Sequence, residues 1–207
     1  MRIALIHALR HSPPPVEAAF ARLWPEATLM SLLDTSLSAD LARDGALTPA
    51  MTERFLTLAR YAHGTGAAGI LFTCSAFGPC IEACAAALPI PVLKPNEAAI
   101  EEACATHRHV GLLASFQPTL DSMPPEFPAG VMLTPRLAQG ALAALDAGDA
   151  AGHDRLIVEA ARGMPCEAIL LAQFSMAHVA RAVAAATGKP VFTTPDSAVR
   201  KLQRLLG

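Results

Sequence analysis

Cys74 is the residue whose surroundings in the sequence best suit chemistry. It follows an apolar run at 69–72 and Thr73, and it precedes Ser75 and a Gly-Pro pair at 78–79, where a helix can begin. A thiol near a helix N-terminus meets free backbone N–H groups that stabilise the thiolate and lower its pKa. We therefore predict that Cys74 is catalytic and that the hydroxyl groups of Thr73 and Ser75 help to bind a substrate. The alternative, a structural cysteine buried at the end of a strand, stays open.

The other four cysteines are predicted to be structural. Cys80 and Cys84 lie four residues apart on an expected helix, but Cys84 belongs to an alanine-rich run, and no second cysteine or histidine pair completes a zinc site. The total of five cysteines is odd, and the chain is long enough to fold without disulfides. We therefore expect reduced thiols in the cytoplasm and no bound metal.

The composition argues against several classes of protein. The chain has 207 residues, 53% of them hydrophobic, so it can bury one large core or two smaller ones. Its 16 basic and 18 acidic residues nearly balance and are scattered, which argues against nucleic acid or an anionic membrane as a partner. The apolar runs are far shorter than the ~20 residues of a membrane span, and the N-terminus leads directly into a strand-like segment. We expect a soluble protein that is not exported.

Short apolar runs alternate with helical stretches along the whole chain. This order is typical of α/β proteins, in which βα units surround parallel sheets. Several helices are expected to begin at a proline or after a serine, and Pro/Gly clusters at 12–15 and 123–130 indicate loops. The expected strands are 2–7, 28–32, 69–73, 92–94, 109–114, 131–134, 168–172 and 191–194. The expected helices are 14–23, 49–65, 79–88, 98–106, 137–147, 152–162, 176–187 and 197–206.

The two halves of the chain resemble each other. The segment 69–75 aligns with 168–174 at an offset of 99 residues, which pairs Cys74 with Gln173. The same offset pairs 91–93 with 190–192, while 3–8 aligns with 110–115 at an offset of 107, as one change in loop length would produce. Chance likeness between apolar strands is the alternative. We predict two pseudo-symmetric α/β domains, 1–95 with a C-terminal helix at about 197–207, and 96–196, each a parallel sheet flanked by helices.

This duplication predicts where a ligand binds. In open parallel sheets, ligands bind beyond the carboxyl ends of the strands, so equivalent strand ends of two facing halves would line one cleft. The side chains expected there are those of His7, Cys74, Ser115, Thr119, Gln173 and Ser175. Cys74 and Gln173 would face each other across the cleft. His7 could orient a substrate or tune the thiolate, or it could be a hydrogen-bonded structural histidine.

At these residues the chain resembles the aspartate/glutamate racemase superfamily, which includes hydantoin racemases, maleate isomerases and arylmalonate decarboxylases. The likeness rests on the strand end at 73–75, on the segments 110–120 and 169–176, and on the stretch 188–198. It covers most of the chain in the family's order. The resemblance implies two pseudo-symmetric α/β domains with the active site between them, no cofactor, a small carboxylic acid as substrate, and dimers or larger homo-oligomers.

One position departs from the family's racemases, which use two cysteines on opposite faces of the substrate carbon. Cys74 matches the first, but Gln173 stands where the second is expected, and an amide cannot relay a proton. Cys166 precedes Gln173 by seven residues, which places it roughly 20 Å away at the other end of the strand. His178 could reach back from the next helical turn. The departure predicts an enzyme in which a single cysteine transfers a proton or isomerises a small acid at the carbon next to its carboxylate.

Other functions stay open. A lyase resembling the arylmalonate decarboxylases would also use one cysteine, although theirs lies in the second half of the chain, and resemblance to maleate isomerases implies attack of the thiol on an activated double bond. A carboxylate-binding protein without activity is a further alternative. In each case Ser75, Ser115, Thr119 and Ser175 are expected to bind the carboxylate, unless Ser115 and Thr119 only cap helices. Gln173 would donate a hydrogen bond or only fill space.

Overall fold

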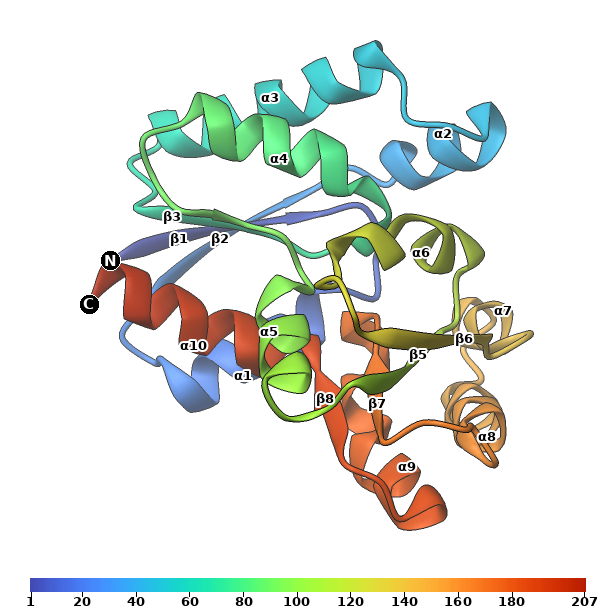
Figure 1. Cartoon of the computed structure of the whole chain (residues 1–207). Helices are drawn as coiled ribbons and strands as arrows, with labels where there is room; N and C mark the ends of the chain where they lie inside the picture. Colours follow the sequence, from blue (N-terminus) through green and yellow to red (C-terminus); the bar gives the residue numbers. More distant parts are fainter. The chain divides into compact units, whose positions relative to one another are not determined.

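The computed structural model describes residues 1–207, which form two compact units, Met1–Pro95 with Pro195–Gly207, and Asn96–Thr194. Each unit holds one four-stranded parallel sheet with helices packed against it (Figure 1). The expected fold class, two similar α/β halves with parallel sheets flanked by helices, is confirmed. The division into domains stays a prediction, because compactness does not show that either unit folds alone.

The first unit is built around a sheet with the strand order β2-β1-β3-β4. Its strands are β1 (Arg2–His7), β2 (Thr28–Leu33), β3 (Gly69–Phe72) and β4 (Val92–Leu93). The central strands β1 and β3 are almost continuously apolar and buried, as expected for strands covered on both faces.

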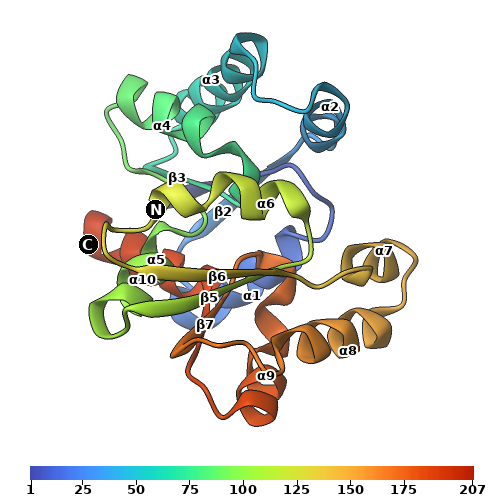
Figure 2. The same ribbon diagram turned by 45° about the vertical axis from the view of Figure 1, so that its right-hand side comes forward.

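Five helices surround this sheet: α1 (Pro13–Leu23), α2 (Ser36–Asp44), α3 (Pro49–Gly64), α4 (Gly78–Ala87) and α10 (Thr194–Leu206). The helices α3 and α4 lie side by side over one face of the sheet (Figures 1 and 2). The last helix, α10, joins α1 on the other face, where Gln203 Nε2 donates to Leu23 O at 2.9 Å. The C-terminus of the chain therefore completes the unit that the N-terminus begins.

The second unit repeats this arrangement with the strand order β6-β5-β7-β8. Its strands are β5 (His109–Ala114), β6 (Met132–Leu137), β7 (Ala168–Leu171) and β8 (Val191–Thr193), and its helices are α5 (Glu97–Thr106), α6 (Gln117–Ser122), α7 (Ala141–Asp146), α8 (Ala150–Ala161) and α9 (Ala180–Thr187). Side chains alternate along β5, because successive residues of a strand point to opposite faces. Leu112 packs in the cluster that holds Ile100 of α5, while Leu113 packs in the cluster that holds Ile157 of α8.

Three short 3₁₀ segments interrupt the helical pattern, η1 (Ser75–Phe77), η2 (Pro124–Glu126) and η3 (Phe174–Val179). Each predicted strand is present, but several helix boundaries are wrong. The helix expected from residue 137 begins at Ala141, because β6 keeps pairing with β5 as far as Leu137 opposite Ala114. The helix expected from residue 176 begins at Ala180 after η3, and α2 and α6 were not predicted. No helix of the chain combines the length and apolar character needed to cross a membrane.

We predict that Gly111→Ala destabilises the second unit. A Cβ atom built at Gly111 in β5 would lie 2.8 Å from both Cys166 Sγ and Met164 Cε. Both neighbours are buried, so relieving the overlap should lower the free energy of unfolding by about 1–2 kcal/mol, measured in urea.

The matched control is Gly64→Ala at the end of α3, where a Cβ atom would meet nothing within 4 Å. It should leave stability unchanged or slightly raised, because alanine favours a helix. If Gly111→Ala unfolded at the same urea concentration as the control, tight packing around β5 would be contradicted.

Candidate active site

Cys74 lies directly beyond the carboxyl end of the central strand β3. Its backbone is extended (φ −122°, ψ 120°), and η1 separates it from the first turn of α4, which begins at Gly78. Thr73 N donates to Ile6 O at 3.0 Å, so β1 still holds the chain one residue before the cysteine. Cys74 is only 7% exposed. The residue therefore occupies a buried strand end, as the pattern indicates, but not the first turn of a helix.

Burial controls the acidity of this thiol. It raises the pKa of Cys74 to about 11, although hydrogen bonds from the Ala76 backbone and the Ser38 side chain act to lower the pKa. The expectation of a lowered pKa is therefore wrong, because the loss of hydration outweighs these two hydrogen bonds. Cys74 is a neutral thiol at neutral pH, which can give up a proton more readily than it can accept one. Ser38 belongs to α2 and has no signal in the sequence that would mark it as a neighbour of Cys74.

His7 ends β1 beside Thr73. His7 Nδ1 lies 2.8 Å from Thr73 Oγ1, and this hydroxyl donates in turn to Ile6 O at 3.4 Å. The Thr73 oxygen must then accept from Nδ1–H, which leaves the lone pair of His7 on Nε2. Burial lowers the pKa of His7 to about 4, so the ring is neutral at neutral pH. Nε2 is buried and has no hydrogen-bond partner.

A narrow pocket brings His7 and Cys74 together within the first unit. It is too narrow to hold a water molecule, and its lining is otherwise apolar. The lining residues are Ile6, His7, Ala8, Leu37, Phe55, Phe72 and Cys74. The structure thus places a neutral thiol and a neutral imidazole with a free acceptor on the same small cavity. Thr73 does not line this pocket, but it hydrogen-bonds with His7, which does.

Gln173 occupies the equivalent strand end in the second unit. It is extended (φ −136°, ψ 144°) beyond β7 and precedes η3, as Cys74 precedes η1. Its Oε1 accepts hydrogen bonds from Ser115 N at 2.6 Å and from Ser115 Oγ at 3.1 Å. Both donors of Ser115 are therefore engaged by Gln173, so the Nε2 end of the amide is the end that can meet a ligand. That Cys74 and Gln173 face each other stays a prediction.

The remaining predicted ligand-binding residues lie close to these strand ends in the chain. Ser75 begins η1 and is buried, and Thr119 is buried in the short helix α6. Ser175 is half-buried in η3. Their role in binding a carboxylate stays a prediction.

The His178 side chain is hydrogen-bonded to Asp154 and does not reach back to Gln173. Its Nε2 lies 2.8 Å from Asp154 Oδ1, which ties the side chain to α8. His153 also bonds to this carboxylate, so a His-Asp-His cluster forms between α8 and η3. The sequence does not predict this cluster, because no spacing between residues 153 and 178 indicates their contact.

Comparison with known proteins agrees with this architecture. The family model for Asp/Glu/hydantoin racemases matches residues 16–202. No curated protein sequence matches the chain significantly.

Solved structures of several enzymes share the fold. A glutamate racemase from Thermus thermophilus, in complex with β-chloro-D-alanine, superposes with a TM-score of 0.76 at 21% identity, over 98% of this chain and 79% of that one. An allantoin racemase from Klebsiella pneumoniae gives 0.71 at 17% identity, over 99% and 87% of the two chains. An arylmalonate decarboxylase gives 0.68 at 18% identity, over 100% and 93%. At these identities the likeness shows the fold alone.

We predict that Cys74 reacts slowly with iodoacetamide at neutral pH. Only the thiolate is alkylated, so a pKa of about 11 should make the rate rise roughly tenfold per pH unit until pH 10 or above. Peptide mass spectrometry on the folded protein measures the rate at Cys74 itself. The urea-unfolded chain is the control, in which the rate should level off above the ordinary thiol pKa of about 8.5. A rate for the folded protein that levels off near pH 8 would contradict the high pKa.

Proposed function

The chain belongs to the Asp/Glu/hydantoin racemase family, and from this premise we propose that it is an enzyme that transfers a proton at the carbon next to a carboxylate of a small acid. Cys74 is the proposed acid and works as the single thiol of the site, without a cofactor. The observation that carries the proposal is the pair of equivalent strand ends, one with a buried neutral thiol and the other with an amide held by Ser115.

The proton-transfer step follows from the protonation state of Cys74. In isomerisation, the minor thiolate form of Cys74 first removes the α-proton, which breaks the C–H bond and leaves a carbanion or enediolate. The thiol then returns a proton to this carbon, which forms a C–H bond and regenerates the thiolate. The amide of Gln173 cannot deliver a proton to the opposite face, so protonation from one side yields a single stereoisomer. His7 Nε2, a neutral acceptor on the same pocket, is a candidate to take up a proton from solvent and pass it to the Cys74 thiolate, which restores the thiol.

The same protonation state favours a second candidate function, decarboxylation. A base that removes an α-proton must be ionised, yet a thiol with a pKa of about 11 is ionised in only about one molecule in 10⁴ at pH 7. Loss of CO2 from a malonate-type acid produces the carbanion without any base, and the neutral thiol then supplies the proton. The electron pair of the broken carbon–carbon bond stays on the α-carbon and forms the new C–H bond.

Substrate binding is proposed to use neutral donors. Gln173 can donate through Nε2 while its Oε1 stays on Ser115, so Ser115 is proposed to position Gln173 and not to bind the substrate itself. Ser75, Thr119 and Ser175 remain proposed donors to the carboxylate and to the developing enolate oxygen. We also retain cytoplasmic location and assembly into homo-oligomers as predictions.

The deciding experiment incubates the protein in D2O with amino acids, hydantoins, malonates and maleate. We expect deuterium at the carbon next to the carboxylate in one configuration, and Cys74→Ser should lower kcat by roughly 10²–10⁴-fold because the acid is lost. NMR detects the deuterium, and CO2 release separates a lyase from an isomerase. The control is Cys80→Ser, because the sulfur of this buried cysteine lies 3.4 Å from Thr52 Oγ1, a partner that a serine hydroxyl can keep.

Other outcomes would reject parts of the proposal. Equal activity of wild type and Cys74→Ser would exclude Cys74 as the acid. Racemisation of both enantiomers at similar rates would show that a second group supplies protons on the face assigned to Gln173. Binding of carboxylates without turnover of any substrate would favour the carboxylate-binding protein.

We predict that Gln173→Glu raises KM for a carboxylate substrate with little loss of stability. A glutamate oxygen can accept both hydrogen bonds of Ser115, so the fold should be kept. The other oxygen replaces the Nε2 donor and brings a like charge towards the substrate, so KM should rise by on the order of tenfold or more. Steady-state kinetics and thermal unfolding measure the two effects. An unchanged KM would remove Gln173 from the binding site.

A further inference from the structure

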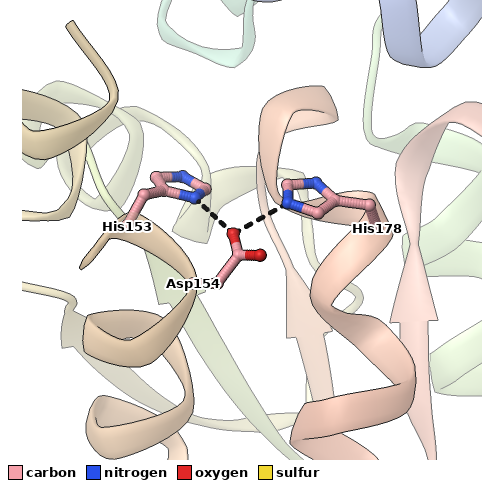
Figure 3. Close-up of side chains that lie close together, drawn as sticks. All are labelled: His153, Asp154 and His178. Carbon is pink, nitrogen blue, oxygen red and sulfur yellow. Dashed lines mark hydrogen bonds and ion pairs between the residues drawn. The ribbon is translucent and has the colours of Figure 1, made fainter. Parts of the chain in front are cut away.

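Three side chains of the second unit converge on one another. His153 and Asp154 lie in the first turns of α8, and His178 comes from η3 (Figure 3). Oδ1 of Asp154 lies 3.0 Å from His153 Nδ1 and 2.8 Å from His178 Nε2. The two imidazole rings flank the carboxylate and are nearly parallel, with an interplanar angle of 14° and 5.8 Å between their centroids.

The three groups form a donor set suited to a metal ion. One ligand atom of each residue can be chosen so that all three atoms lie within 4.8 Å of one another. A tetrahedral zinc ion with Zn–N and Zn–O distances near 2.0–2.1 Å holds its ligand atoms roughly 3.3 Å apart. The observed nitrogen–oxygen distances of 3.0 and 2.8 Å need to open by only a few tenths of an ångström. Two imidazoles and one carboxylate favour zinc, cobalt, nickel or copper over magnesium or calcium.

Burial and charge give this cluster a closed side and an open side. The His153 side chain is fully buried, and its Nε2 has no hydrogen-bond partner. The Asp154 and His178 side chains are 39% and 54% exposed, so an ion and one or more water ligands can reach the site from solvent. The ion-pair partners of Asp154 are the two histidines, which places no lysine or arginine on the carboxylate. Asp149, which caps α8 through Gly152 N at 2.8 Å, offsets the positive end of the helix dipole.

We propose that His153, Asp154 and His178 form a binding site for a divalent transition-metal ion of the zinc class. His153 Nδ1, an oxygen of Asp154 and His178 Nε2 are the ligands, and water completes the coordination shell. For the ion to bind, His153 Nδ1 and His178 Nε2 must each offer a lone pair, so the proton that each nitrogen now donates to Asp154 moves to the other nitrogen of the ring. The ion links α8 to η3, the segment that follows Gln173. It therefore restricts the movement of the chain just beyond the end of β7. This site does not depend on the proposed function of Cys74.

The test is metal binding by the full chain after treatment with EDTA and in the presence of a non-thiol reductant. Zinc titrated into the wild-type protein at pH 7.5 should give one binding event by calorimetry, with a higher Tm when zinc is in excess. Cobalt bound at the same site should lack the thiolate-to-metal absorption of a cysteine site. Binding should weaken at pH 5.5, because protons compete with the metal ion for the ligand atoms.

Two substitutions separate this site from the five cysteines and from the rest of the surface. His178→Ala removes an exposed ligand, and Asp154→Asn removes the charge but keeps a hydrogen-bond acceptor. Each should weaken zinc binding by roughly 100-fold. Removing a group that only orients a ligand costs about 10–100-fold in metal affinity, and removing a ligand itself should cost at least the upper end of that range. The control is His107→Ala, a histidine of the same unit outside the cluster, which should bind zinc as the wild type does. Absence of zinc binding by the wild type, or equal binding by wild type and both cluster variants, would overturn the proposal and leave a hydrogen-bonded cluster only.

Discussion

Two equivalent backbone hydrogen bonds position the strand ends on which the candidate site depends. Thr73 N donates to Ile6 O at 3.0 Å in the first unit, and Ala172 N donates to Leu113 O at 2.9 Å in the second. Each bond holds the chain one residue before the key side chain, Cys74 or Gln173. Because the strands are parallel and in fixed register, the residues that follow β1 and β5 must end beside those that follow β3 and β7.

The same backbone carries different chemistry in the two units. Gln173 receives both of its hydrogen bonds from Ser115, the residue that follows β5. In the internal repeat, Ala8 corresponds to Ser115 and has no hydroxyl group. The hydroxyl that hydrogen-bonds with Cys74 comes instead from Ser38 of α2, whose single proton is donated to Ala8 O at 3.0 Å. The repeat therefore preserves the positions of the strand ends but not the partners of their side chains.

Burial then sets the protonation states of the groups around Cys74. Loss of hydration raises the pKa of the thiol and lowers the pKa of His7, and in both cases it favours the neutral form. A neutral acid beside a neutral acceptor suits the protonation of a carbanion better than its generation. These protonation states are why we propose Cys74 as the acid, and why decarboxylation stands beside isomerisation as a candidate reaction.

The sequence by itself determined the strands, the internal repeat and the positions of Cys74 and Gln173 at equivalent strand ends, because buried parallel strands require apolar runs that are visible locally. It could not place α2, whose short and polar sequence resembles a loop, and it set the start of α7 too early because the pairing of β6 with β5 is a long-range contact. Only the tertiary structure decided the pKa of Cys74, the engagement of Ser115 by Gln173 and the cluster of His153, Asp154 and His178. Each of these depends on groups that are distant in the chain and on how completely they exclude water, which no local pattern of residues encodes.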